Sequence, residues 1–273
     1  MARVTTKDGT ELYYNDWGQG RPVVLVPGWP LDADMWSDQA VFLAENGFRA
    51  ITYDRRGFGR SSQPWTGYDY DTLADDLAAV LDHLDLSHVT LVGFSMGGGE
   101  VARYLARHGS ARIAKAVLVS AVTPYLLKTN DNPTGVDPSV FDQMIDGLRK
   151  DRPHFLAGFA KGLYGNGLVG RRVSDEVLQW SLQMAMMGSL RATIECVKAF
   201  SATDFRADMA AFTVPTLIIH GTSDASVPID HSGRVAAKMI PSARLVEYDG
   251  EPHGLFATAK DRLNADLAAF AGA

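Results

Sequence analysis

Residues 91–100 read Leu-Val-Gly-Phe-Ser-Met-Gly-Gly-Gly-Glu and place Ser95 inside the pattern G-x-S-x-G. The apolar residues before it, 88–92, predict a buried strand, and residues 101–107 predict a helix. A P-loop is excluded because no Lys-Ser/Thr pair follows the glycines, and a dinucleotide loop because Ser95 stands where its second glycine belongs. The stretch therefore predicts a serine in a strained turn, with Gly93 and Gly97 leaving room for it.

A pattern this short also arises by chance, so the rest of the chain is needed to support it. Composition first narrows the class of protein and its partners. With 273 residues, 46% of them hydrophobic, the chain can bury the core of one large domain or of a domain with an insertion. The net charge of −6 and the absence of basic runs argue against nucleic acid or an anionic membrane as the main partner. Cys196 is the single cysteine, which fits a reducing compartment. With no signal-peptide pattern and no run of about 18 apolar residues, we expect a soluble, cytoplasmic protein.

Strand and helix patterns alternate along most of the chain. After a predicted hairpin around Asp8-Gly9, helical patterns cover residues 36–46 and 73–84, and apolar runs predict strands at 22–26, 48–53, 114–120, 214–219 and 243–248. The runs are apolar throughout, which is typical of a parallel sheet covered on both faces.

This alternation breaks between about residues 124 and 211, where helical patterns occur without strands. Phe141, Met144, Ile145 and Leu148 follow the spacing of one helix face, and residues 177–187 are similarly one-sided. We therefore predict a core formed by residues 1–123 and 212–273, and a helical cap formed by residues 124–211. A cap between two strands of one sheet would cover the carboxyl edge, where such sheets bind ligands.

A serine hydroxyl becomes a good nucleophile only beside a base, so Ser95 needs a histidine, and that histidine needs an orienting carboxylate. His253 lies in a loop directly after the last predicted strand, and Asp224 lies in the loop after the preceding strand. The order Ser95, Asp224, His253 is the one expected of a catalytic triad on an open α/β sheet. The other histidines are interpreted as surface or structural residues: His83, His88, His108, His154, His220 and His231.

Three other acidic residues compete for the role of the triad acid. Asp249 and Glu251 lie too near His253 in sequence to approach it easily from a neighbouring strand end. Asp54 ends a strand, and we interpret it as a brace for the turn at residues 55–59.

The tetrahedral intermediate of acyl transfer needs hydrogen-bond donors for its oxyanion. Met96, directly after the nucleophile, would supply one backbone N–H. Trp29 would supply the other, because its N–H lies between Pro27 and Pro30, which have none.

Residues 9–270 resemble the bacterial arylesterases and cofactor-free (non-haem) haloperoxidases, or perhydrolases, of the α/β-hydrolase fold. The resemblance rests on GWPLDADMW (28–36), YDRRGFGRSS (53–62), GYDYDTLADDL (67–77), LVGFSMGGGE (91–100), VPTLIIHG (214–221) and PHG (252–254). It implies a mostly parallel eight-stranded sheet with helices on both faces and a helical cap. It also implies the triad and the two oxyanion donors named above, without a metal or a cofactor.

The resemblance further suggests an apolar substrate pocket formed by Phe94, Val122, Leu126, Met144, Phe159, Leu163 and Ile229. Phe159 and Leu163 could equally form the packed core of the cap, since apolar helix faces usually pack inward. Pro30 is a further candidate, because it restricts the backbone of Trp29 and could leave a carbonyl facing an incoming peroxide. The chain departs from the family at Pro27, where a histidine is usual, in the loop of residues 27–30 that holds Trp29, here called the oxyanion loop.

These residues predict a serine hydrolase of small carboxylic esters that works through an acyl-enzyme and also transfers the acyl group to hydrogen peroxide. We expect no cofactor, and a homo-oligomer is compatible with the family. Two alternatives stay open: a γ-lactam hydrolase, and a non-catalytic small-molecule receptor on the same fold. A haloalkane dehalogenase is disfavoured, because its nucleophile is an aspartate and position 95 is a serine.

Overall fold

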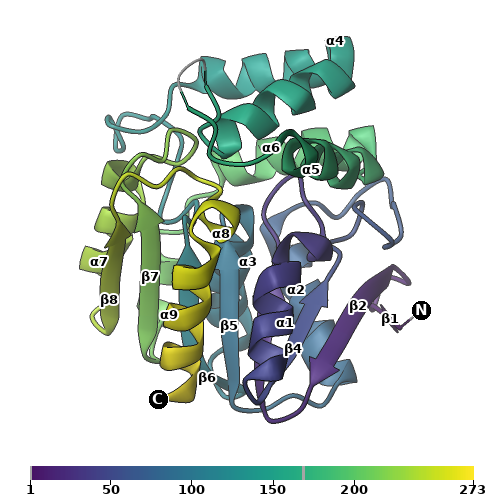
Figure 1. Cartoon of the computed structure of the whole chain (residues 1–273), viewed down its shortest axis with the longest axis vertical. Coiled ribbons are helices and arrows are strands. Elements are labelled where there is room, and N and C mark those ends of the chain that lie inside the picture. Colours follow the sequence, from purple (N-terminus) through teal and green to yellow (C-terminus); the bar gives the residue numbers. More distant parts are fainter. Residues whose placement is uncertain (1, 168–169) are drawn as a thin grey trace.

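An eight-stranded sheet runs through the centre of the protein, as the computed structural model of residues 2–167 and 170–273 shows (Figure 1). The strand order is β1-β2-β4-β3-β5-β6-β7-β8. β1 and β2 form the predicted hairpin at one edge, and β2 is antiparallel to β4, whereas the remaining pairs are parallel. The strands span Arg3–Thr5, Glu11–Gly18, Arg21–Val26, Phe48–Tyr53, Val89–Phe94, Ile113–Val119, Thr216–Gly221 and Ala243–Tyr248.

Helices cover both faces of this sheet. α1 (Ser37–Glu45), α8 (Leu255–Thr258) and α9 (Lys260–Gly272) pack on one face, while α2 (Tyr70–His83), α3 (Met96–His108) and α7 (Gly233–Met239) pack on the other. Alternate residues of β3 enter opposite layers: Val24 and Val26 join the core under α2 and α3, and Val23 and Leu25 join the core under α1 and α9. Because successive strand side chains point to opposite faces and both faces are buried, the strands are apolar throughout.

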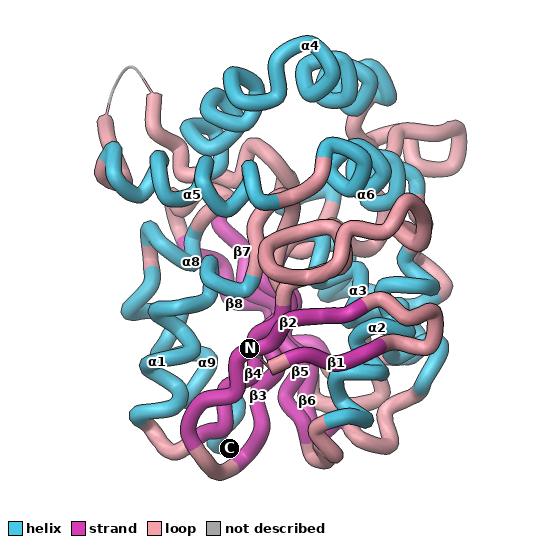
Figure 2. Tube along the Cα trace, turned by 90° about the vertical axis from the view of Figure 1, so that its right-hand side faces the viewer, coloured by secondary structure: helices cyan, strands magenta, loops and turns pink. Residues whose placement is uncertain are grey.

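The chain between β6 and β7 forms α4 (Pro138–Leu163), α5 (Asp175–Met187) and α6 (Leu190–Ala202), which lie beyond one end of the sheet (Figures 1 and 2). α4 is kinked at Asp151, whose backbone leaves the helical region two residues before Pro153. A proline inside a helix lacks the N–H for the intrahelical bond and crowds the preceding turn, which explains the kink. The end that these helices cover is the carboxyl end of the parallel strands, where Ser95, Asp224 and His253 are located.

Short 3-10 helices complete the connections: η1 (Ala33–Trp36), η2 (Asp208–Ala211) and η3 (Ile229–His231). Across residues 2–167 and 170–273, none of the helices has the length and apolar character needed to cross a lipid bilayer.

Candidate active site

Ser95 occupies the sharp turn between β5 and α3. Its backbone has φ 52° and ψ −117°, a strained conformation for a residue other than glycine. The flanking glycines are required for space: a Cβ on Gly93 would lie 2.4 Å from the Gly97 carbonyl oxygen, and one on Gly97 would lie 2.6 Å from the Val26 carbonyl oxygen. The turn therefore presents the Ser95 side chain at the carboxyl edge of the sheet.

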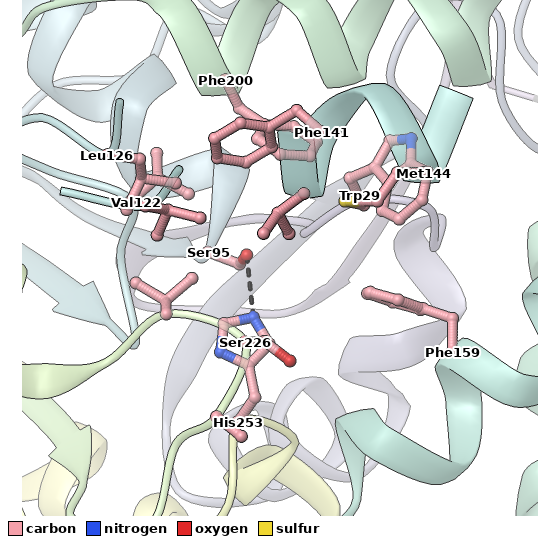
Figure 3. Close-up of a pocket in the computed structure, with 14 residues that line it drawn as sticks. Trp29, Ser95, Val122, Leu126, Phe141, Met144, Phe159, Phe200, Ser226 and His253 are labelled. Carbon is pink, nitrogen blue, oxygen red and sulfur yellow. Dashed lines mark hydrogen bonds between the residues drawn. The ribbon is translucent and has the colours of Figure 1, made fainter. Parts of the chain in front are cut away.

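A continuous chain of hydrogen bonds joins the three residues of the predicted triad. The Ser95 Oγ lies 2.9 Å from Nε2 of His253 (Figure 3), and the His253 Nδ1 lies 2.6 Å from Oδ2 of Asp224. All three side chains are buried. The other carboxylate oxygen of Asp224, Oδ1, accepts from the backbone N–H groups of Ser226 and Val227 at 2.9 and 2.7 Å. The geometry therefore allows His253 to take the hydroxyl proton of Ser95 while Asp224 orients the ring.

Burial alone would raise the pKa of Asp224, because a low dielectric disfavours the carboxylate. His253 and His220 beside it outweigh burial and hold the pKa of Asp224 well below its usual range. The carboxylate is therefore ionised throughout the neutral pH range.

His220, which the sequence indicates as a surface or structural residue, is a direct neighbour of Asp224. It ends β7, is fully buried, and its Nε2 lies 3.2 Å from Oδ2 of Asp224 and 2.8 Å from the Val227 carbonyl oxygen. The sequence signal is its position four residues before Asp224, at the end of the strand that the Asp224 loop follows. The other histidines, His83, His88, His108, His154 and His231, make no hydrogen bond to the triad within the described chain.

The competing acids have other partners. Asp249 accepts a hydrogen bond from the Thr222 hydroxyl, and Glu251 accepts one from the Thr258 hydroxyl. Asp54 accepts from the backbone N–H of Ala33 and binds Arg60 through both carboxylate oxygens. Asp54 thus braces the chain around the turn at 55–59, as its sequence position indicated.

The loop after β3 lies against the nucleophile. A Cβ on Gly28 would lie 3.2 Å from the Cβ of Ser95, so the glycine allows this close approach. The Trp29 indole N–H donates to the Thr193 carbonyl at 3.0 Å, which holds this loop against α6. Over residues 2–167 and 170–273, the backbone N–H groups of Trp29 and Met96 have no protein acceptor, so both are available to a bound oxyanion.

A cavity of about 200 Å³ opens above Ser95 (Figure 3). No Asp, Glu, Lys or Arg side chain of the described residues lines it, and its polar side chains besides the indole of Trp29 are those of Ser95, His253 and Ser226. The remaining lining is apolar: Val122, Leu126, Val136, Val140, Phe141, Met144, Phe159, Phe200, Ala225 and Val227. Such a cavity suits an uncharged, mainly apolar molecule.

Four of the predicted pocket residues line this cavity: Val122, Leu126, Met144 and Phe159. Four others do not. Phe94 points to the opposite face of β5, because strand side chains alternate, and its ring meets Trp36 and Phe256 there. The same ring packs against the imidazole of His253, with centroids 4.8 Å apart, so Phe94 contacts the triad from outside the cavity. Leu163 packs in the core under α1 and α9. Ile229 is buried in η3, and Pro30 is itself buried and is joined to Trp29 by a cis peptide bond.

The sequence did not identify several lining residues. Phe141 carried a signal, since it lies one helical turn before Met144 on the predicted apolar face. Val136, Val140, Phe200, Ala225, Ser226 and Val227 carried none, because their position depends on how α4, α6 and the Asp224 loop pack over Ser95.

The chain is similar to several known proteins. Residues 21–260 match the family model described as the alpha/beta hydrolase fold. A non-heme chloroperoxidase from Kitasatospora aureofaciens is 46% identical over 272 residues, and a bifunctional esterase/perhydrolase from Acinetobacter calcoaceticus is 44% identical over 274 residues, with 99% of each chain covered. The crystal structure of a bromoperoxidase from Bacillus anthracis has a TM-score of 0.96 and 46% identity, covering 100% of this chain and 99% of the other. The chain belongs to the arylesterase and non-haem haloperoxidase (perhydrolase) family of the α/β-hydrolase fold.

Proposed function

We propose that this protein hydrolyses small, uncharged carboxylic esters through an acyl-enzyme on Ser95, and that it also transfers the acyl group to hydrogen peroxide. The single observation that carries the proposal is the buried chain of hydrogen bonds from Ser95 through His253 to Asp224, which opens into an apolar cavity. The names of the relatives, a chloroperoxidase and an esterase/perhydrolase, support the same two activities.

The first half of the reaction forms the acyl-enzyme. The Ser95 Oγ attacks the ester carbonyl carbon, and its proton passes to Nε2 of His253 over the 2.9 Å contact. Asp224 stabilises the imidazolium that results. The carbonyl oxygen becomes an oxyanion that the backbone N–H groups of Trp29 and Met96 bind. When the carbonyl re-forms, the C–O bond to the alcohol breaks and His253 returns the proton to the leaving alcohol.

The second half releases the acid. Water attacks the acyl carbon, gives its proton to His253 and displaces Ser95, which regains a proton. Hydrogen peroxide attacks in the same way and forms a peracid, R–CO–OOH, with no change in the oxidation state of the enzyme. Because both nucleophiles use the same base and the same oxyanion donors, they compete for one acyl-enzyme.

The substrate reaches Ser95 beneath the cap that we propose for residues 124–211. α4 and α6 supply Val140, Phe141, Met144, Phe159 and Phe200 to the cavity wall, so the cap would select the acyl or alcohol group by size and polarity. A wall without fixed charges would disfavour carboxylate-bearing esters, since a buried charge needs a partner.

Two further proposals concern the state of the protein in the cell. A cytoplasmic location fits the single, buried Cys196. A homo-oligomer fits the exposed apolar side chains Trp65, Met187 and Leu190, which lie on adjoining segments. Light scattering over a range of protein concentrations tests the oligomer, and cell fractionation tests the location.

The function is tested with a panel of aryl esters, alkyl esters and γ-lactams, each with and without hydrogen peroxide. We expect turnover of the esters, peracid formation with peroxide, and a loss on the order of 10⁶ in kcat in Ser95→Ala. Circular dichroism should show an unchanged fold in this variant. Turnover of lactams alone would favour the lactam hydrolase, and the absence of any Ser95-dependent turnover would favour the receptor.

A further inference from the structure

A buried ion pair holds the backbone of the oxyanion loop. Arg55, which is 1% exposed, donates from Nη2 to the Pro27 carbonyl oxygen at 2.5 Å and from Nε to Oε1 of Glu100 at 2.5 Å. Glu100 is fully buried, and its second oxygen accepts from the Tyr53 hydroxyl at 2.7 Å. We call Arg55, Glu100 and the Pro27 carbonyl the loop clamp.

The loop clamp joins the two segments that carry the oxyanion donors. Pro27 is two residues before Trp29, in the loop after β3, and Glu100 lies on α3, which begins at Met96. The peptide between Pro27 and Gly28 is held at both edges, because its carbonyl binds Arg55 and its N–H donates to the sulfur of Met35 at 3.3 Å. Fixing this peptide limits the rotation of the next one, whose N–H belongs to Trp29.

We propose that Arg55 is a positioning residue that fixes the Trp29 N–H relative to the Met96 N–H through the Pro27 carbonyl and Glu100. This inference rests on the proposed ester hydrolysis. The contact is made to a backbone carbonyl, so it does not depend on the side chain at position 27. It explains how the loop is braced in a chain that carries Pro27 where its family usually has a histidine.

The burial of the Arg55–Glu100 ion pair and the shape of the guanidinium support a positioning role over a purely stabilising one. Two buried charges lose their hydration, and an apolar pair of similar size is often as stable, so a buried ion pair is weak grounds for inferring stability. A guanidinium, however, presents several donors in a rigid plane and can hold a carboxylate and a carbonyl at once. A methionine and a leucine could fill the same space but could not hold the carbonyl.

The clamp should affect the transition state more than the bound substrate. The oxyanion forms only as the tetrahedral intermediate is approached, so poorly placed donors lower kcat and leave KM nearly unchanged. Loss of folded protein would also lower the apparent kcat, because it reduces the active fraction, but it would leave the kcat of each active site unchanged. The kcat per active site therefore separates positioning from stability.

Two variants test the inference in the full-length protein. Arg55→Lys keeps the positive charge beside Glu100 but loses the planar guanidinium, which binds Glu100 and the Pro27 carbonyl at once. The double variant Arg55→Met/Glu100→Leu removes both charges together. We expect kcat for an aryl ester to fall about 10-fold in the first and about 100-fold in the second, with KM within about twofold. The affinity for an arylboronic acid, which forms a tetrahedral adduct on Ser95, should weaken in parallel with kcat.

A neighbouring ion pair supplies the matched control. Arg56 is also 1% exposed and binds Asp76 through two contacts of 2.6 Å, but it makes no hydrogen bond to the oxyanion loop. Arg56→Met/Asp76→Leu should perturb packing similarly, while the molecules that fold keep wild-type kcat.

Three outcomes overturn the inference: wild-type kcat in folded Arg55→Lys, an equal loss in the Arg56/Asp76 control, or an unchanged affinity for the boronic acid. If the double variant does not fold, Arg55→Lys decides alone. Failure of the proposed function is distinct, because the wild-type protein would then show no Ser95-dependent hydrolysis.

Discussion

His220 and His253 share one carboxylate oxygen: Oδ2 of Asp224 lies 2.6 Å from Nδ1 of His253 and 3.2 Å from Nε2 of His220. The His220 Nε2 also lies 2.8 Å from the Val227 carbonyl, so this nitrogen must carry the proton that both oxygens accept. The His220 Nδ1 is buried and has no partner within the described residues. Asp224 is therefore held from both sides by imidazole N–H groups.

Replacing His220 should change how Asp224 acts on His253. In His220→Leu the Asp224 carboxylate loses one of its donors, so it is held less firmly and orients the His253 ring less well. We expect kcat/KM for an aryl ester to fall roughly tenfold at neutral pH. His220→Gln, whose amide can still donate, should stay within about threefold of the wild-type kcat/KM. Equal losses in the two variants would show that His220 only fills space.

Asp224→Asn should cripple the enzyme, whereas Asp249→Asn should be mild. The amide can no longer hold the productive tautomer of His253 or stabilise its positive charge, which costs roughly 10⁴ in kcat. Asp249 serves as the matched control because its side chain accepts from Thr222 and not from His253. Steady-state kinetics at neutral pH measure both losses of kcat. A larger loss in Asp249→Asn than in Asp224→Asn would show that Asp249 is the triad acid.

Phe159 and Leu163 lie one helical turn apart on α4 and should have different roles. Phe159 lines the cavity and packs edge to face on Trp29, with ring centroids 5.0 Å apart, whereas Leu163 packs in the core. Phe159→Ala should raise kcat/KM for bulky acyl groups several-fold relative to acetyl, because it enlarges the cavity. Leu163→Ala should leave that ratio unchanged and lower the free energy of unfolding by about 2–5 kcal/mol. An unchanged acyl preference in folded Phe159→Ala would show that Phe159 does not contact the acyl group.

Asp32 should make the protein less stable as the pH rises. Burial, with Asp54 and Asp34 nearby, raises the pKa of Asp32 to about 7, whereas the unfolded chain titrates near 4. Between these values the folded protein holds a proton that the unfolded chain has released, so stability falls through this window as pH increases. Asp32→Asn keeps the oxygen that accepts from the Asp34 N–H and carries no charge.

We therefore expect Asp32→Asn to stabilise the protein by on the order of 2–4 kcal/mol at pH 8 and by little at pH 4. Melting temperatures at the two pH values measure the effect. Asp38→Asn, at an exposed aspartate of α1, should show no comparable gain. An equal gain for Asp32→Asn at both pH values would assign the effect to packing and not to charge.

Pro30 should influence the choice between water and peroxide in the acyl-enzyme. Proline disfavours the helical region for the residue before it, and the Trp29 carbonyl accepts no hydrogen bond within the described chain. Hydrogen peroxide carries a second hydroxyl that this carbonyl could accept, and one such bond is worth ~1 kcal/mol, or several-fold in partition. Pro30→Leu should lower the ratio of perhydrolysis to hydrolysis several-fold, measured on one ester. An unchanged ratio would leave Pro30 with a structural role only.

The sequence by itself determined the sheet and the three residues of the predicted triad. Apolar runs such as residues 22–26 predicted strands because a sheet covered on both faces excludes polar side chains along its length. Ser95, Asp224 and His253 could be grouped because each follows a strand, and the carboxyl ends of parallel strands meet at one edge. This reasoning needs only the order of the elements along the chain.

Only the tertiary structure decided the cavity wall and the supports of the site. Phe94 adjoins Ser95 in sequence but faces the opposite layer, and Phe200 lies far away in sequence but lines the cavity. Arg55 follows β4 and Glu100 lies on α3, and the fold brings the two side chains together beside the Pro27 carbonyl. Such contacts depend on side-chain directions and on the packing of helices over the sheet, which local patterns of polarity do not encode.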